Sequence, residues 1–120
     1  MATVEDLFPV ALYHVRVSIY DGAVKCRIRE TRAVLERDRY KTLDNEKIKL
    51  SSIMVEVADP NDSELERFAW CDDAGKLEEC IGMLKRGLKR TAEDRLNKAM
   101  EMHRIALEKV TEIEHRAFKE

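Results

Sequence analysis

YHVRVSIYDGAVKCRIRE, residues 13–30, carries the clearest structural signal in the chain. Apolar and polar residues alternate on both sides of Asp21-Gly22, as they do in strands with one buried face. The Asp-Gly pair accepts the positive φ values that a type I′ turn requires. The stretch therefore predicts a β-hairpin over residues 12–31.

Further strands are expected downstream of the hairpin. A third strand fits residues 33–40, although its middle is highly charged. Leu43-Asp44-Asn45 has the composition of a turn. Alternation resumes in residues 47–58, but its phase slips at Ser51-Ser52, which predicts a β-bulge or a bend. Asp59-Pro60-Asn61-Asp62 ends the segment, because proline cannot donate to a β ladder.

Residues 65–71 allow two interpretations. Ser63 could cap a short helix at this point. Phe68 and Trp70, however, occupy alternate positions in a short aromatic segment, which is typical of a strand. A final strand is the preferred interpretation, and the helix stays open as the alternative.

The last third of the chain carries a helical pattern. Asp72-Asp73 supplies N-cap candidates and negative charge at its start, where free amide donors favour both. No proline follows, and apolar residues recur at Leu77, Ile81, Leu84, Leu88, Ala92, Leu96, Met100, His103, Leu107, Val110 and Ala117. The pattern predicts an amphipathic helix about forty residues long, on the order of 60 Å if unbroken. Gly82 and Gly87 favour a break near residues 87–91, so a helical hairpin is the alternative.

These elements predict an α+β fold, a small N-terminal antiparallel β-sheet followed by a long C-terminal α-helix or helical hairpin. Residues 1–120 are expected to form a single domain, with a sheet part at 10–71 and a helical part at 73–118. Part of the helical stripe has the spacing of a coiled-coil seam: Leu96, Met100, His103, Leu107 and Val110. The chain is therefore expected to self-associate as a dimer or higher oligomer.

Composition argues against several classes of protein. Lys and Arg number 22 against 24 Asp and Glu, a formal net charge of −2, so binding to long nucleic acid is not expected. No stretch approaches about 18 apolar residues, and residues 1–6 lack a basic leader pattern, so membrane insertion and secretion are not expected. We therefore expect a cytoplasmic protein.

The sequence offers little for a metal site. Cys26, Cys71 and Cys80 are odd in number and lack CxxC spacing, so we expect reduced cysteines in the core and neither a disulfide framework nor a zinc ribbon. Glu112 and His115 form a single Glu-x-x-His unit, which di-iron bundles use twice with additional glutamates. No metal site and no cofactor are predicted.

Motifs for catalysis are also missing. The sequence holds no GxSxG, HExxH, P-loop or Rossmann fingerprint, and its 4 glycines give little backbone to cradle phosphate. His103 lies on the helical stripe, where a packed or interface residue is the ordinary interpretation. The sequence therefore predicts a protein that is not an enzyme.

Charge clusters are more informative. Lys25, Arg27 and Arg29 share one face of a strand because side chains alternate between the two faces. Arginine presents a planar fork that matches phosphate, so this patch is a candidate anion site. A solvent-facing sheet surface explains the same charges, and that alternative stays open.

Two further features point to a small anionic ligand. Arg86 and Arg90 are four residues apart on the helix, and they repel each other unless an anion neutralises them. Pairing with the acidic stretch 59–79 across a dimer is an equally ordinary explanation of the basic residues. Phe68 and Trp70 could stack on a base, although a packed tryptophan is the alternative. The predicted ligand-binding residues are Arg27, Arg29, Phe68, Trp70, Arg86, Arg90, Asn97 and Arg104.

The order of elements resembles that of small phage-encoded proteins. A hairpin with a DG turn, a basic second strand, the segment EKIKLSSI at 46–53, the strand FAWC at 68–71 and a long charged helix follow one another. This layout, over residues 12–118, is similar to the Thoeris anti-defence sponge family. The resemblance implies an oligomer in the host cytoplasm that sequesters a cyclic ADP-ribose signal without cleaving it, in pockets where chains meet.

We therefore expect a non-enzymatic protein that binds a small phosphorylated signalling nucleotide of the cyclic ADP-ribose type, in a phage counter-defence role. Arginine forks would hold the phosphates and an aromatic face the base. The alternative is an inhibitor or adaptor whose charged C-terminal helix docks on another protein.

Overall fold

The computed structural model describes residues 2–58 and 65–119, with side chains as far as residue 114. The chain divides into two compact units, residues 1–88 and residues 89–120. The first unit contains the sheet and the first three turns of the long helix. The expected segment end at 59–62 and the alternative cap at Ser63 lie outside the described residues.

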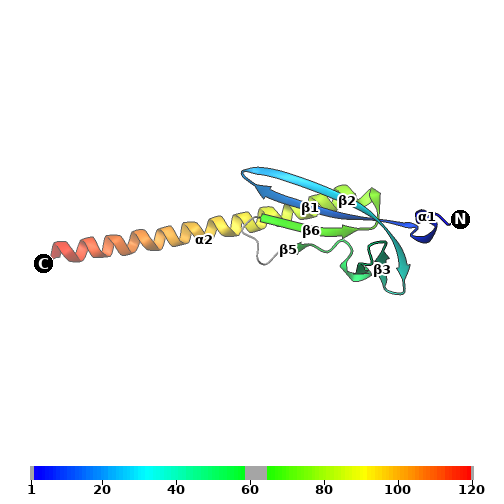
Figure 1. Ribbon diagram of the computed structural model, residues 1–120. Coiled ribbons are helices and arrows are strands. Elements are labelled where there is room, and N and C mark those ends of the chain that lie inside the picture. The colour runs from blue at the N-terminus through cyan, green and yellow to red at the C-terminus, as the bar shows by residue number, and fades with distance from the viewer. Residues whose placement is uncertain (1, 59–64, 120) are drawn as a thin grey trace. The chain divides into compact units, whose positions relative to one another are not determined.

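A 6-stranded sheet with the order β4-β3-β2-β1-β6-β5 forms the body of the first unit (Figure 1). All neighbouring strands are antiparallel. The strands are β1 (Val10–Tyr20), β2 (Ala23–Glu36), β3 (Arg39–Thr42), β4 (Lys47–Lys49), β5 (Val57–Ala58) and β6 (Leu65–Cys71). A short helix, α1 (Val4–Leu7), precedes the strands and was not predicted from the sequence. A capping box between Thr3 and Asp6 caps its N-terminus.

The predicted hairpin is confirmed and is longer than expected. Asp21 and Gly22 have φ values of 51° and 76°, as a type I′ turn requires. The two-residue turn fixes the register from Tyr20 opposite Ala23 to Val10 opposite Ala33. The strand preferred for residues 65–71 is also confirmed as β6, which pairs with β1.

The third strand predicted over residues 33–40 is wrong. The chain continues as β2 to Glu36, reverses at residues 37–38 with Arg37 at a φ of 57°, and returns as β3 from Arg39. The charged residues that made a strand middle unfavourable lie in and beside this turn, where water solvates them. The predicted turn at Leu43-Asp44-Asn45 is confirmed, with Asn45 at a φ of 66°.

The predicted bend at Ser51-Ser52 is a 3-10 turn, η1 (Leu50–Ser52), and not a β-bulge. It carries the chain from β4, at one edge of the sheet, to β5, at the other edge. Ile53 bridges Trp70 on β6, so the two edges approach each other and the sheet curls. A small core fills this curl, made of Leu12, Ala33, Tyr40 and Ile48 with Val10, Ile53 and Trp70 packed against it.

The long helix is continuous. Asp73 accepts a hydrogen bond from the Gly75 amide at 2.9 Å and starts a 3-10 turn, η2 (Ala74–Lys76), which leads into α2 (Leu77–Lys119). The predicted break near Gly87 is absent from α2, so the long-helix form of the α+β prediction is confirmed. No helix in the described part of the chain combines the length and apolarity that a membrane crossing needs.

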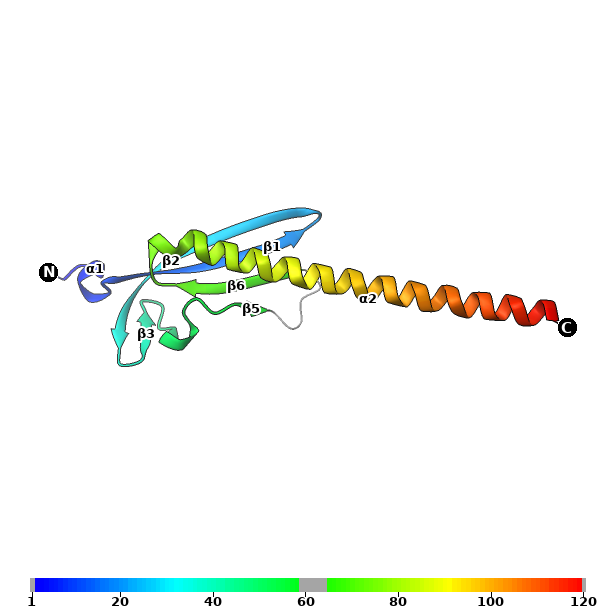
Figure 2. The same cartoon turned by 180° about the vertical axis from the view of Figure 1, so that it is seen from behind.

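The start of α2 covers one face of the sheet (Figure 2). The core beneath it contains Val15, Val17, Ala69, Cys71, Cys80, Leu84 and Leu88. Cys71 and Cys80 are therefore core residues as predicted, and burial raises the pKa of the Cys80 thiol to about 11. Cys26 is exposed, contrary to the prediction, because α2 packs over β1 and β6 and leaves the start of β2 uncovered.

Gly87 marks a close approach of the Glu56 side chain to the helix and not a break in the helix. A Cβ atom at this position would overlap the carboxylate of Glu56, which pairs with Arg67 Nε at 3.3 Å. We predict that Gly87→Ala lowers the free energy of unfolding by about 1–3 kcal/mol, because the carboxylate must leave that site. Urea unfolding followed by circular dichroism measures the change.

Gly82 provides the matched control on the same helix. A Cβ atom there would meet only the end of the exposed Arg86 side chain, at 3.3 Å. Gly82→Ala should therefore raise the free energy of unfolding by about 0.5–1 kcal/mol through helix propensity alone. Equal effects from the two substitutions would contradict this account of Gly87.

Candidate functional site

The two faces of the sheet differ in chemistry. Side chains of β1 alternate, so that Val15 and Val17 face α2 while His14 and Arg16 face the other way. Cross-strand partners share a face, so the pairing places Lys25, Arg27 and Arg29 of β2 beside them. The same pairing adds Glu66, Phe68 and Trp70 of β6. We call this surface, opposite α2, the cationic face.

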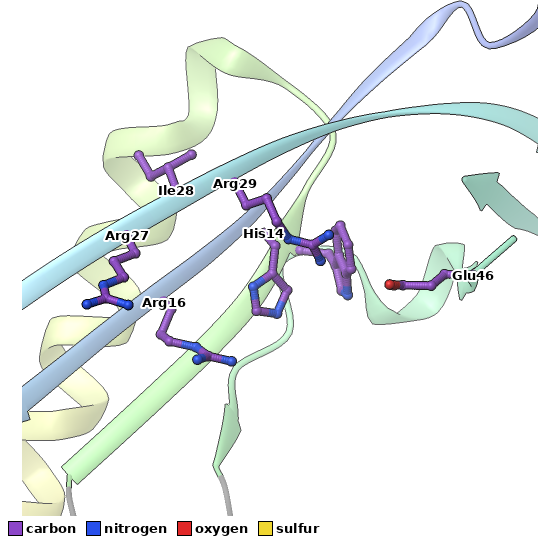
Figure 3. Close-up of a pocket in the computed structure, with 7 residues that line it drawn as sticks. His14, Arg16, Arg27, Ile28, Arg29 and Glu46 are labelled. Atoms are coloured by element: carbon purple, nitrogen blue, oxygen red, sulfur yellow. The ribbon is translucent and has the colours of Figure 1, made fainter. Parts of the chain in front are cut away.

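A pocket of about 680 Å³ lies at the end of the cationic face nearest the small core. His14, Arg16, Arg27, Ile28, Arg29, Glu46 and Trp70 line it. In Figure 3 the His14 ring and the Arg29 guanidinium lie in the middle of the group, with Glu46 on the opposite side from Arg27. The volume is in the range of sites that hold small organic ligands.

Aromatic rings form the floor of the pocket. The His14 ring meets the Trp70 ring edge-on with centroids 4.8 Å apart, and it lies 5.2 Å from the Phe68 ring. The Arg29 guanidinium carbon is 5.8 Å from the centre of the Trp70 ring, in cation–π range. Trp70 also packs against the small core, which holds its ring in place. Trp70 thus both packs against the small core and lines the pocket.

Charge in the pocket is predominantly positive. Arg16 Nε binds the Glu66 carboxylate at 2.8 Å, whereas Arg27 and Arg29 have no carboxylate within ion-pair distance among the described residues. Glu46 is the one acidic residue in the lining. The Glu46 amide donates to the Thr42 hydroxyl at 3.0 Å, so the turn holds this residue in position.

A second hollow of about 330 Å³ continues the pocket along the cationic face. Arg16 and Arg27 line both hollows, and Tyr20 and Lys25 line the second, where the Lys25 ammonium lies 5.5 Å from the Tyr20 ring centre. The two hollows give a groove with side chains suited to anions and aromatic rings.

The environment of His14 in the groove disfavours a protonated ring. Partial burial is the main cause that lowers the pKa of His14 below its ordinary value, and the charges of Arg16 and Arg29 lower it further. Glu46 opposes them. The ring is therefore neutral at neutral pH, and an anion bound beside it would favour the protonated form.

Four of the predicted ligand residues lie on the cationic face: Arg27, Arg29, Phe68 and Trp70. The structure does not bring Arg86 to them, since it is exposed on α2, on the other side of the sheet. Arg90, Asn97 and Arg104 belong to the unit of residues 89–120. The Arg104 guanidinium binds the carboxylates of Glu101 and Glu108 on its own helix.

Sequence reasoning missed four residues of the pocket lining, which are His14, Arg16, Ile28 and Glu46. His14 and Arg16 could have been found, because a two-residue turn at Asp21-Gly22 already places them opposite Arg29 and Arg27. Glu46 gave no such signal, since its place depends on how β3 and β4 curl over the sheet.

Metal-ligating side chains do not gather in the part of the chain that the structure describes: no three His, Cys, Asp or Glu residues could hold an ion together. The Glu112–His115 pair cannot be placed, because the His115 side chain lies outside that part.

Comparison with known proteins identifies no relative: no family model, no curated protein and no solved structure matches the chain. The resemblance in layout to the Thoeris anti-defence family therefore stays untested. Function has to be inferred from the chemistry of the groove.

Proposed function

We propose that the chain binds and holds a small phosphorylated nucleotide in the groove of the cationic face, without cleaving it. One observation carries the proposal. The Trp70 ring lies within contact range of both the His14 ring and the Arg29 guanidinium, and Arg27 lines the same pocket without a carboxylate partner among the described residues. The groove therefore combines stacking surfaces with charged forks.

A nucleotide has a complementary pair of groups. Its base can stack on the exposed part of Trp70 and on His14, and such stacking contributes about 1–3 kcal/mol per base. Its phosphates can accept paired hydrogen bonds from Arg27 and Arg29, which are the stronger, charge-assisted kind. Neutral His14 can add a donor or gain a proton.

The proposed ligand class extends to signals of the cyclic ADP-ribose type, in which a purine and a pyrophosphate occur in one compact molecule. Sequestering such a signal intact is a counter-defence role that a phage protein in a host cytoplasm could serve. The layout of the sequence suggests this finer identity, and the mixed aromatic and cationic lining is compatible with it.

Titration calorimetry tests the proposal. The panel contains AMP, ADP, ADP-ribose, cyclic ADP-ribose isomers and cyclic AMP, with inorganic phosphate and adenosine as controls for charge alone and base alone. We expect at least one nucleotide to bind clearly more tightly than either control. Silence across the panel, or binding no stronger than that of inorganic phosphate, would refute the proposal.

Affinity should rise as pH falls. The pKa of His14 lies below its ordinary value in the free protein, and a bound anion raises it, so binding takes up a proton. Cyclic AMP keeps a constant charge between pH 7.5 and 5.5, which makes it the suitable probe. We predict that its affinity rises over this range, because the anion and the proton on His14 favour each other's binding.

His14→Gln serves as the control for that titration, because it keeps a polar side chain that does not ionise. Its cyclic AMP affinity should vary much less with pH. A wild-type affinity that is flat or falls towards pH 5.5 would contradict the role given to His14.

The second unit supports the proposed self-association. Five positions of α2 follow one another at intervals of four, three, four and three residues. Four of them carry apolar side chains that are more than half exposed, and the middle one is His103. The four apolar residues are Leu96 (59%), Met100 (61%), Leu107 (69%) and Val110 (53%). This is the spacing of a coiled-coil seam, and a second copy of the chain offers the same seam. We propose that copies pair along it.

Substitution of the seam should change the mass of the assembly in solution. Leu107→Glu places a charge in the seam and is predicted to shift light-scattering mass towards the monomer. Ile105→Glu is the matched control, because Ile105 lies roughly 160° around the helix from Leu107 at 100° per residue. A monomeric wild-type chain would favour the alternative function, an adaptor whose helix docks on a different protein.

A further inference from the structure

Among the described residues, one edge of the sheet is unpaired along about half of β2, its longest strand. β1 pairs with β2 from Ala23 to Ala33, whereas β3 pairs on the other side only from Ala33 to Glu36. Within the described residues no strand lies beside residues 23–30 on that side. We call this stretch the docking edge.

The backbone groups at this edge can be identified from the register. In the two-residue hairpin, Tyr20 and Ala23 form the hydrogen-bonded pair that closes the turn, so odd-numbered residues of β2 bond to β1. The N–H and C=O groups of Val24, Cys26 and Ile28 therefore point outward. Arg32, in the same even-numbered set, confirms this, since its carbonyl accepts from the Leu43 amide at 3.1 Å.

Side chains beside these free groups form two contrasting rows. On the face that α2 covers elsewhere, Val24 is 59% exposed and Ile28 46% exposed, with exposed Cys26 between them. On the cationic face, Lys25, Arg27 and Arg29 are exposed. An exposed apolar row, a cationic row and unpaired backbone groups thus occur together on one strand.

A second copy of the chain is a poor partner for this edge in overlapping antiparallel pairing. Antiparallel pairing of two docking edges through their outward groups sets even residues opposite even ones, and hence odd residues opposite odd ones. Registers in which the two stretches 25–29 overlap place cations of one copy opposite those of the other on the same face. Like charges directly opposite destabilise a strand pair.

We propose that the docking edge binds an extended segment of another protein in which acidic and apolar residues alternate. Its backbone would add a strand to the sheet, as in β-augmentation. Its acidic side chains would lie beside Lys25, Arg27 and Arg29, and its apolar side chains beside Val24, Cys26 and Ile28. This docking does not depend on the proposed nucleotide function. If both hold, the acidic side chains compete with the nucleotide, because Arg27 and Arg29 line its pocket.

A defined peptide tests the docking with the intact chain. The probe is a nine-residue peptide, capped at both ends and labelled, that alternates Glu and Val, and its binding is followed by fluorescence anisotropy. An analogue with Lys in place of Glu should bind at least tenfold more weakly. Equal binding of the two peptides, or no binding of either, would overturn the proposal.

Backbone methylation of the same peptide separates strand addition from simple charge attraction. Successive amides of a strand point to opposite sides, so only one alternating set can bond to the docking edge. If the peptide pairs antiparallel to β2, methylation of the Val amides should abolish binding. If it pairs parallel to β2, methylation of the Glu amides should abolish binding. If both methylated peptides bind like the parent, or neither binds, the edge does not add a strand and the proposal fails.

A protein variant gives the complementary test. Cys26→Pro removes an outward N–H without removing a bond to β1, and Cys26→Val changes the side chain alone. The Glu-Val peptide should bind Cys26→Pro at least tenfold more weakly and Cys26→Val with little change. Circular dichroism checks folding, and the methylated peptides carry the test if Cys26→Pro does not fold.

Discussion

Replacing Arg27 and Arg29 together by alanine should lower the affinity for the best nucleotide of the panel by at least about a hundredfold. Each guanidinium is expected to make charge-assisted hydrogen bonds to phosphate, which contribute about 1.5–3 kcal/mol apiece, and a factor of ten corresponds to 1.4 kcal/mol. Both side chains are exposed, so their loss should leave the free energy of unfolding nearly unchanged. Titration calorimetry and urea unfolding measure the two quantities.

Arg39→Ala is the matched control for this double variant. Arg39 is a half-exposed arginine on β3, and its Nε lies 3.8 Å from Asp38 Oδ1. It lines neither hollow of the groove. Its substitution should leave nucleotide affinity within about twofold, the range of an ordinary surface change. An equal loss in both variants would mean that net charge, and not the groove, holds the ligand.

Leu84→Ala should produce a large loss of stability in the first unit. Leu84 is 0% exposed in the core between α2 and the sheet, where it shares a cluster with Val15, Ala69 and Cys80. Removing its side chain costs about 2–5 kcal/mol, because the transfer free energy is lost and a cavity is left. Urea unfolding followed by tryptophan fluorescence reports this change through Trp70.

Leu43→Ala provides the comparison. Leu43 is 45% exposed in the turn before β4, and its amide keeps the hydrogen bond to Arg32 in the alanine variant. Its effect on the free energy of unfolding should stay below about 1 kcal/mol. A small effect of Leu84→Ala, similar to that of Leu43→Ala, would show that the start of α2 does not close the core.

Local patterns were enough for much of the fold. The hairpin followed from alternation around Asp21-Gly22, and β6 from the alternate placing of Phe68 and Trp70. The long helix followed from its stripe. In each case neighbouring residues carry the information, because side-chain direction repeats every two residues in a strand and every 3.6 in a helix.

Two of the errors in the fold prediction have a common physical cause, which is contact between distant segments. Gly87 suggested a break, but the Glu56 side chain occupies the space beside it. The phase slip at Ser51-Ser52 suggested a local bulge, yet it is the point where the chain crosses between the sheet's two edges. The sequence of residues 47–58 alone does not distinguish a local bulge from a crossing between the two edges of the sheet.

The candidate site was predictable in part for the same reason. Alternation put Arg27 and Arg29 on one face, and the turn register could have added His14 and Arg16. Trp70 lies beside His14 because β6 pairs with β1. The spacing of residues in the sequence does not reveal this long-range pairing. Arg86 was linked to the site through its charge, whereas the helix that carries it covers the opposite face.

Mass spectrometry of the ligand after release tests the central claim most directly. The purified chain is loaded with a nucleotide that binds in the calorimetric panel, washed, held for hours and then heat-denatured. We predict that the intact nucleotide is recovered in an amount close to that bound by the chain, and that the Arg27/Arg29 double variant retains almost none. Recovery of a cleaved product, or equal retention by the double variant, would contradict the proposal that the groove holds a nucleotide without processing it.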